Sequence, residues 1–187
     1  MSEPSQVVVL AEDKRTERFI WCFLRCLSYS RHQYRSLVTS HGSGEKFVRE
    51  YLPREVRALR ARQASSVLIA VVDADSGTVD NRRNQLLESL KHAGVPRPTS
   101  KEPIIILIPR RNIETWLTCL LGSEADEIRD YKPNPGTKSA NELDGKVPLA
   151  GEKFYSTTRP NESIPQTFVD SLRRAIPEAG RVPRSER

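Results

Sequence analysis

The segment VLIAVVDADSGTVD, residues 67–80, places the strongest constraint on the fold. Its first six residues are apolar without interruption, and they do not alternate with polar residues. Continuous apolar strands are typical of a sheet that is covered on both faces, as in parallel α/β proteins. The run ends at Asp73 and Asp75, so a buried strand is predicted to deliver two carboxylates to one edge of the sheet.

Strands and helices are predicted to alternate along the rest of the chain. The helical segments have apolar residues at three- and four-residue steps, and Pro53 is expected to divide the second helix into two segments. The resulting order βαβαβαβα predicts an α/β fold, a doubly wound, Rossmann-like parallel sheet flanked by helices. Strands are expected at 6–13, 34–40, 67–72 and 103–109, and helices at 16–27, 47–59, 79–90 and 111–121.

A single domain is expected, because a chain of 187 residues lies within the common range of about 100–200 residues for one domain. The α/β core is predicted at about 5–122, followed by an irregular, loop-rich C-terminal extension and a terminal helix at 123–187. Residues 130–165 are rich in Pro, Gly, Lys and polar residues, which predicts a long loop. The apolar positions of the terminal helix are Phe168, Val169, Leu172 and Ile176.

Acidic residues follow three of the predicted strands. Glu12 and Asp13 follow the first strand, Asp73 and Asp75 follow the third, and Glu114 lies just beyond the fourth. The carboxyl ends of parallel strands meet at one edge, where ligands gather in such sheets. Crowded carboxylates repel one another, and a hard divalent cation, Mg²⁺ or Mn²⁺, is the usual remedy.

Acidic residues at strand ends also occur in several other classes of protein and in a purely structural role. Each carboxylate could instead cap a helix N-terminus or be a solvated surface charge, and we expect one of these two roles for Asp80. A haloacid-dehalogenase phosphatase carries its Asp-x-Asp after the first strand, whereas here the pair follows the third. A receiver-like phosphoacceptor domain has an acidic pair like Glu12-Asp13, but it expects Ser or Thr where this chain has Pro109. A nucleotide-sugar transferase usually needs a longer chain.

The order of the motifs resembles that of the Toprim family. That family has a Glu at the end of its first strand and an Asp-x-Asp at the end of its third, and Glu12, Asp73 and Asp75 stand at those places. AEDKRTERFI resembles the first motif of OLD-type Toprim proteins, with Glu17 in the helix and Asp13 in place of a glycine. IPRRNIETWL resembles a basic-then-Glu-x-Trp segment of small stand-alone Toprim-like proteins encoded beside an ATPase, including phage-defence systems.

The resemblance implies a magnesium-dependent nuclease with Glu12, Asp73 and Asp75 as metal ligands. Glu17 and Glu114 would support a second metal or lie behind the ligands, and Glu114 could instead cap a helix or form an ion pair with a nearby arginine. A separate ATPase partner is implied, since the sequence lacks the Gly-x-x-x-x-Gly-Lys-Ser/Thr phosphate-binding motif. The alternative is a non-catalytic Toprim-like binding subunit. The sequence does not decide whether the chain forms a homo-oligomer.

The positive charge of the chain favours a nucleic-acid partner. The formal net charge is +6, and Arg110 and Arg111 directly follow the fourth strand, next to the acidic edge. These two arginines are also the candidates for the ion pair with Glu114. Further candidates for phosphate contacts lie in the predicted loop: Lys138, Lys146, Lys153 and Arg159.

The remaining composition argues against a membrane protein or a zinc site. The longest aliphatic run, Ile104–Ile108, is too short to span a bilayer, and the first residues are not a basic and apolar leader, so a cytoplasmic protein is expected.

Cys22 and Cys26 fit an apolar helix face as buried thiols. No zinc-ligand spacing connects Cys119 with the three histidines, His32, His41 and His92.

Overall fold

A four-stranded, all-parallel sheet with the order β2-β1-β3-β4 forms the centre of the molecule, and six helices pack on it. The computed structural model describes residues 6–39, 43–62 and 65–185. The predicted α/β class is therefore confirmed. The elements are β1 (Gln6–Ala11), α1 (Lys14–Cys26), β2 (Tyr34–Val38), α2 (Gly44–Ala61), β3 (Ser66–Val71), α3 (Val79–His92), β4 (Ile104–Leu107), α4 (Ile113–Leu120), α5 (Lys138–Thr157) and α6 (Asp170–Ala179).

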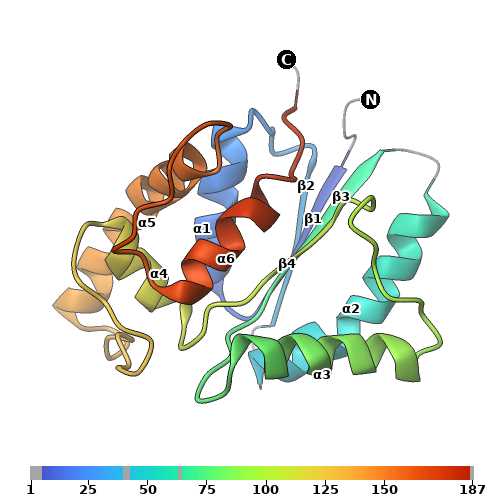
Figure 1. Ribbon diagram of the computed structural model, residues 1–187, viewed down its shortest axis with the longest axis horizontal. Coiled ribbons are helices and arrows are strands. Elements are labelled where there is room, and N and C mark those ends of the chain that lie inside the picture. The colour runs from blue at the N-terminus through green and yellow to red at the C-terminus, as the bar shows by residue number, and fades with distance from the viewer. Residues whose placement is uncertain (1–5, 40–42, 63–64, 186–187) are drawn as a thin grey trace.

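The two central strands, β1 and β3, end at the same level, with Ala11 opposite Val71. Helix α1 leaves β1 on one face of the sheet, together with α4, α5 and α6, whereas α2 and α3 cover the other face (Figure 1). The chain thus turns to opposite faces after β1 and after β3. This is the topological switch point, where open α/β sheets bind ligands.

Both faces of the sheet are buried, which explains the uninterrupted apolar runs. In β1, Val7 and Val9 pack in the cluster with α1, α4, α5 and α6, whereas Val8 and Leu10 pack in the cluster with α2 and α3. Residues of β3 alternate in the same way. Because successive side chains of a strand point to opposite faces, a sheet with two covered faces needs apolar residues at every position.

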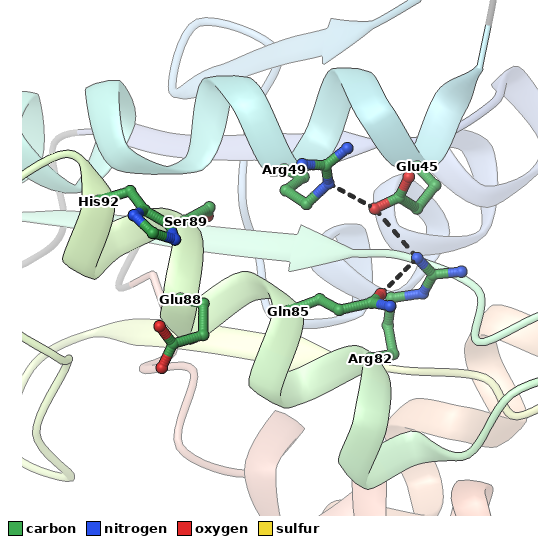
Figure 2. A pocket seen from close by; sticks show the side chains of 7 residues that line it. All are labelled: Glu45, Arg49, Arg82, Gln85, Glu88, Ser89 and His92. Atoms are coloured by element: carbon green, nitrogen blue, oxygen red, sulfur yellow. Dashed lines mark hydrogen bonds and ion pairs between the residues drawn. The ribbon is translucent and has the colours of Figure 1, made fainter.

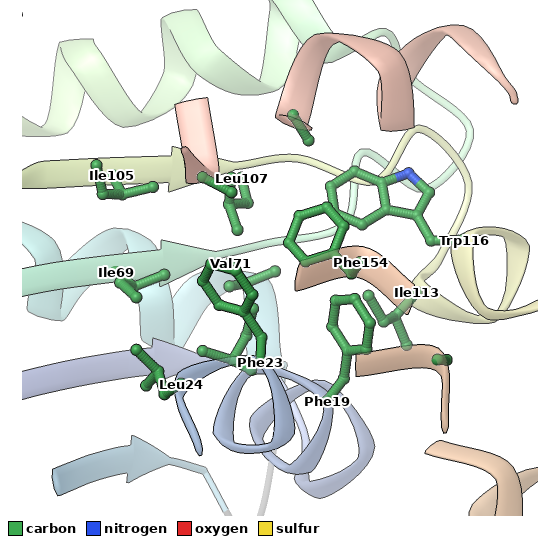
Figure 3. Close-up of a cluster of buried hydrophobic side chains, with 14 of the residues drawn as sticks. Phe19, Phe23, Leu24, Ile69, Val71, Ile105, Leu107, Ile113, Trp116 and Phe154 are labelled. Carbon is green, nitrogen blue, oxygen red and sulfur yellow. The ribbon is translucent and has the colours of Figure 1, made fainter. Parts of the chain in front are cut away.

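Helix α5 occupies much of the segment that was predicted to be a loop, so that prediction is wrong for residues 138–157. The side chain of Phe154 is fully buried, and its ring centroid lies 5.3 Å from that of Phe19 and 5.2 Å from that of Phe23 (Figure 3). A Cβ atom at Gly151 would lie 2.6 Å from Cβ of Cys22. The glycine that suggested a loop therefore permits the close approach of α5 to α1.

Helix α2 continues through Pro53, so the predicted division of this helix is also wrong. The side chains of Val48, Leu52 and Val56 are buried on both sides of the proline and pack against the sheet. Tertiary packing of this apolar stripe outweighs the loss of one backbone hydrogen bond.

The cysteines are free, with Cys22 and Cys119 buried and Cys26 half-buried. Burial raises the pKa of each thiol above its ordinary value, which favours the unreactive protonated form. His41, one of the residues considered for a zinc site, lies outside the described residues. Of the helices in the described part of the chain, none is long and apolar enough to cross a membrane.

Candidate functional site

Glu12 and Asp73 lie side by side where the central strands end. The backbone N–H of Asp73 donates a hydrogen bond of 3.0 Å to Oε1 of Glu12. Past the end of β3, the N–H of Val72 donates to the carbonyl of Leu107 (3.2 Å) and the N–H of Ala74 to that of Pro109 (2.8 Å). Backbone pairing therefore fixes the position of Asp73, and two residues far apart in the sequence form one acidic site at the switch point.

The carboxylates of this site destabilise one another in their charged form. Asp73 is only 6% exposed, and burial, followed by the charges of Glu12, Asp13, Glu114 and Asp75, raises its pKa well above the ordinary value. Burial and the charge of Asp75 raise the pKa of Glu12 to about 7. Among the described residues, none places a hydrogen-bond donor against the Asp73 carboxylate. Such a site favours a bound proton or a bound cation.

Two helix N-termini border the carboxylates. Asp13 caps α1, because its Oδ1 accepts a hydrogen bond of 2.8 Å from the N–H of Thr16. Gly44 begins α2, and a Cβ atom there would lie 2.7 Å from both Cβ and the carbonyl oxygen of Glu12. Only a glycine lets α2 approach Glu12 this closely. Sequence reasoning did not identify Gly44; its place at the start of a helix after Ser43 was the available signal.

Asp75 lies at the rim of the site and is the exposed member of the group. Its φ angle is 54°, a left-handed conformation that aspartate adopts more readily than most residues. The N–H of Gly77 donates to the carbonyl of Ala74 (2.8 Å), which closes the turn around Asp75. Oδ2 of Asp75 lies 3.0 Å from Nη2 of Arg82 in α3.

Glu114 contributes charge to the site but is held by another residue. It is buried in the first turn of α4 and forms an ion pair with Arg15, whose Nε also lies 2.7 Å from Oδ1 of Asp144 in α5. The expected ion pair with one of the arginines after β4 is therefore wrong. The cap of α4 is the side chain of Asn112, and Arg15 instead connects α1, α4 and α5.

Two other acidic residues point elsewhere. Glu17 accepts a hydrogen bond of 2.5 Å from the hydroxyl of Tyr34, so its carboxylate faces β2 and not the acidic site. Asp80 was expected to be a helix cap or a solvated surface charge, and it is the latter: Thr78 caps α3, with its hydroxyl accepting from the N–H of Asn81, and Asp80 is exposed. Asp80 forms an exposed ion pair with Arg174 of α6 at 2.5 Å, which lowers its pKa.

The predicted phosphate-binding arginines are occupied by carboxylates of the next loop. Nη1 of Arg110 lies 3.5 Å from Oε2 of Glu127, and Nη2 of Arg111 lies 3.8 Å from Oδ2 of Asp130. Glu127 also accepts a hydrogen bond of 2.7 Å from the N–H of Ser171 at the start of α6. Both contacts are long and the two arginine side chains are partly exposed, so the guanidinium groups keep free N–H donors beside these partners.

The candidate cations of the C-terminal region lie on or after α5. Lys138 is exposed at the beginning of the helix and lies 3.7 Å from Glu142. Lys146 and Arg159 are exposed as well. Lys153 lines a cavity of about 720 Å³ together with Cys119 and Phe168, and the lining includes none of Glu12, Asp73 and Asp75. Within the described residues, no hydrogen bond or ion pair connects these four cations with the acidic site.

The acidic site fits a hard divalent cation by its chemistry. Its available ligands are carboxylate oxygens, and no described side chain or backbone group donates to the carboxylate of the buried residue Asp73. Mg²⁺ or Mn²⁺ would compensate this negative charge. Within the described ranges, no three acidic, histidine or cysteine side chains already converge as a ligand set. Glu12 holds the N–H of Asp73 and Asp75 holds Arg82, so side chains must turn to share an ion.

No protein-family model matches the chain, and no curated protein or solved structure matches it either.

Proposed function

We propose that this protein is a magnesium- or manganese-dependent nuclease that hydrolyses phosphodiester bonds of DNA or RNA. The observation that carries the proposal is the position of Asp73: the residue is only 6% exposed, lies beside Glu12 at the switch point, and its carboxylate accepts no hydrogen bond from the described residues. The Toprim-like order of Glu12, Asp73 and Asp75 supports the same activity.

The three proposed ligands differ in rigidity. Glu12 and Asp73 are fixed by the ends of β1 and β3, whereas Asp75 is on an exposed turn and can rotate toward them. A bound divalent cation would stabilise charge on the phosphate and lower the pKa of an attacking water. The residues of this chain would hold that ion at a rigid sheet edge, which is what precise positioning requires.

We propose that Arg110 and Arg111 contact the nucleic-acid backbone. They lie after β4, next to Asn112 at the start of α4, and their present partners Glu127 and Asp130 are carboxylates that phosphate oxygens could replace. Any ATP-driven step would belong to a separate ATPase, as in the small Toprim-like proteins that the sequence resembles.

A cleavage assay tests the proposal. Plasmid, single-stranded DNA and transfer RNA are incubated with Mg²⁺, Mn²⁺ or EDTA, with the protein alone and, where a neighbouring gene encodes an ATPase, together with that ATPase. Asp73→Asn should abolish cleavage, and Asp80→Asn is the matched control, because it makes the same chemical change at an exposed aspartate outside the site. Full activity of Asp73→Asn in the complete assembly contradicts the proposal.

A receiver-like phosphoacceptor domain is the second candidate. The strand order β2-β1-β3-β4 matches the first four strands of flavodoxin-like and receiver sheets, and Asp13 and Glu12 lie near Asp73. Incubation with acetyl phosphate and Mg²⁺, followed by intact-mass measurement, distinguishes the two. A phosphorylated adduct that Asp73→Asn removes favours the phosphoacceptor, and its absence favours the nuclease.

A further inference from the structure

Arg82 contacts the acidic site through Asp75 and, like Gly44, was not identified from the sequence. It belongs to the second turn of α3, its side chain is 12% exposed, and its guanidinium group bridges α2 and the turn after β3. Nη1 lies 3.0 Å from Oε1 of Glu45 and 2.9 Å from Oε1 of Gln85 (Figure 2). Nη2 lies 3.0 Å from Oδ2 of Asp75.

The charge of Arg82 matters because the site has little other compensation. In the described part of the chain, Arg82 is the only side-chain cation that contacts any of Glu12, Asp73 and Asp75. Its charge also reaches Glu12, where it opposes the effect of burial on the pKa of that carboxyl. Arg82 therefore supplies the positive charge that a divalent cation would bring.

We propose that Arg82 is the resident counter-ion of the acidic site: it holds Asp75 until that carboxylate turns to a divalent cation, and its freed Nη2 then binds a substrate phosphate oxygen. This inference rests on the proposed metal-dependent nuclease activity and adds a phosphate-binding residue to it. Sequence spacing alone gave no sign of it, since the contact depends on how α3 packs beside the turn.

The packing around Arg82 explains why it would stay after losing Asp75. Glu45 belongs to the first turn of α2, and Gln85 lies one turn further along α3, so both can keep Nη1 in place. The guanidinium group lies in a pocket of about 340 Å³ between α2 and α3, with Arg49 and His92 also in its lining. The Nε of Arg82 is buried and has no hydrogen-bond partner among the described residues. The contact of Nη2 is therefore the one described bond between this guanidinium group and Asp75.

Replacement of Arg82 should have opposite effects on metal and nucleic acid. The positive charge of Arg82 repels a metal ion at the proposed ligands, and its guanidinium group competes with that ion for Asp75. Arg82→Met removes both effects, so this variant should bind Mn²⁺ about three- to tenfold more tightly. Losing a phosphate contact should weaken binding of a single-stranded oligonucleotide about tenfold when Mn²⁺ is present. A residue with only a structural role would not produce this pair of changes.

Arg49→Met is the matched control. Arg49 lies in the same pocket, and its Nε pairs with the same Glu45 oxygen at 2.9 Å, but it does not contact Asp75. Both variants lose one positive charge. Isothermal titration with Mn²⁺ and fluorescence anisotropy with a labelled oligonucleotide should show changes for Arg82→Met and values near wild type for Arg49→Met.

The outcomes separate this inference from the proposed function. Equal or weaker Mn²⁺ binding by folded Arg82→Met, with Mn²⁺ binding by the wild type intact, overturns the counter-ion role and leaves the metal site standing. Absence of Mn²⁺ binding from both proteins overturns the metal site and the inference together. If Arg82→Met does not fold, Glu45→Gln replaces it: Arg82 keeps Gln85 but loses the negative charge that competes with Asp75, so it pairs more strongly with Asp75 and Mn²⁺ should bind about threefold more weakly.

Discussion

The backbone N–H of Asp73 donates a 3.0 Å hydrogen bond to Oε1 of Glu12, which ties the residue after β3 to the residue after β1. Burial and nearby negative charges, Asp75 for Glu12 and Glu12 for Asp73, raise the pKa of both carboxyl groups. We therefore expect the stability of the protein to depend on pH and on divalent cations.

The first prediction concerns pH in the absence of metal. The pKa of Glu12 is raised from 4.5 to about 7, so the folded state retains a proton that the unfolded chain loses. The contribution of the Glu12 carboxyl to the stability of the protein is therefore most favourable below pH 4.5, and it is lost as the pH rises through about 7. Glu12→Gln keeps an oxygen acceptor for Asp73 and removes the charge, so it should stabilise the metal-free protein by about 1–3 kcal/mol near pH 8.

Urea denaturation at about pH 5 and pH 8 measures this effect. Glu142→Gln is the control, because that carboxyl pairs only with the exposed Lys138 on the same helix. A gain of stability in Glu12→Gln that is the same at both pH values would argue against titration of Glu12 as the cause.

The second prediction concerns metal binding. Millimolar Mg²⁺ or Mn²⁺ should raise the melting temperature, since a ligand that binds only the native state stabilises it. The rise should be larger near pH 8 than near pH 5.5, because the ion must displace protons from Glu12 and Asp73. Asp73→Asn should lose most of the rise and Asp80→Asn should keep it. Differential scanning fluorimetry measures these shifts, and an unchanged melting temperature in the wild type would remove the main support for the site.

The third prediction concerns the arginines after β4. Nucleic-acid affinity should fall steeply with salt, because phosphate contacts release counterions. Arg110→Ala combined with Arg111→Ala should reduce both the affinity, about tenfold at low salt, and the slope of the salt dependence. Arg54→Ala combined with Arg97→Ala makes the same charge change at exposed sites elsewhere. Equal losses in the two double variants would mean that only net charge matters.

The fourth prediction separates an enzyme from a binding subunit. Removing both Asp73 and Asp75 by substitution with alanine should abolish metal-dependent cleavage, yet low-salt nucleic-acid binding should be retained or slightly strengthened, because negative charge is lost. Cleavage assays and anisotropy are measured on the same preparations, with and without the proposed ATPase partner. Cleavage that survives this double change would assign the chemistry to another site or chain.

The fifth prediction concerns Gly44. A methyl group there would lie 2.7 Å from Cβ of Glu12, so Gly44→Ala should shift α2 or Glu12, lower stability by about 1–3 kcal/mol and weaken Mn²⁺ binding. Gly145→Ala is the control in α5, where a Cβ meets no atom within 4 Å. It should stabilise the protein by about 0.5–1 kcal/mol, since alanine favours a helix. Equal effects of the two variants, measured by thermal denaturation, would contradict the close packing at Glu12.

The sequence by itself determined the class of the fold and which residues lie at the carboxyl edge. Both follow from local rules: a continuous apolar run such as Val67–Val72 predicts a strand buried on two faces, and alternation with helices forces the strands to be parallel. Because parallel strands end at the same edge, Glu12 and Asp73 were expected to meet, and the register that pairs Ala11 with Val71 brings them together.

Only the tertiary structure decided which charged side chains pair and where a segment rich in glycine and proline nevertheless forms a helix. The partners Arg82 for Asp75 and Arg15 for Glu114 depend on the rotation and packing of whole helices, which no spacing in the sequence records. Glycine and proline between 138 and 157 predicted a loop, yet burial of Phe154 and close contact at Gly151 make this segment a helix. In both cases contacts between distant parts of the chain contribute more free energy than local preference does.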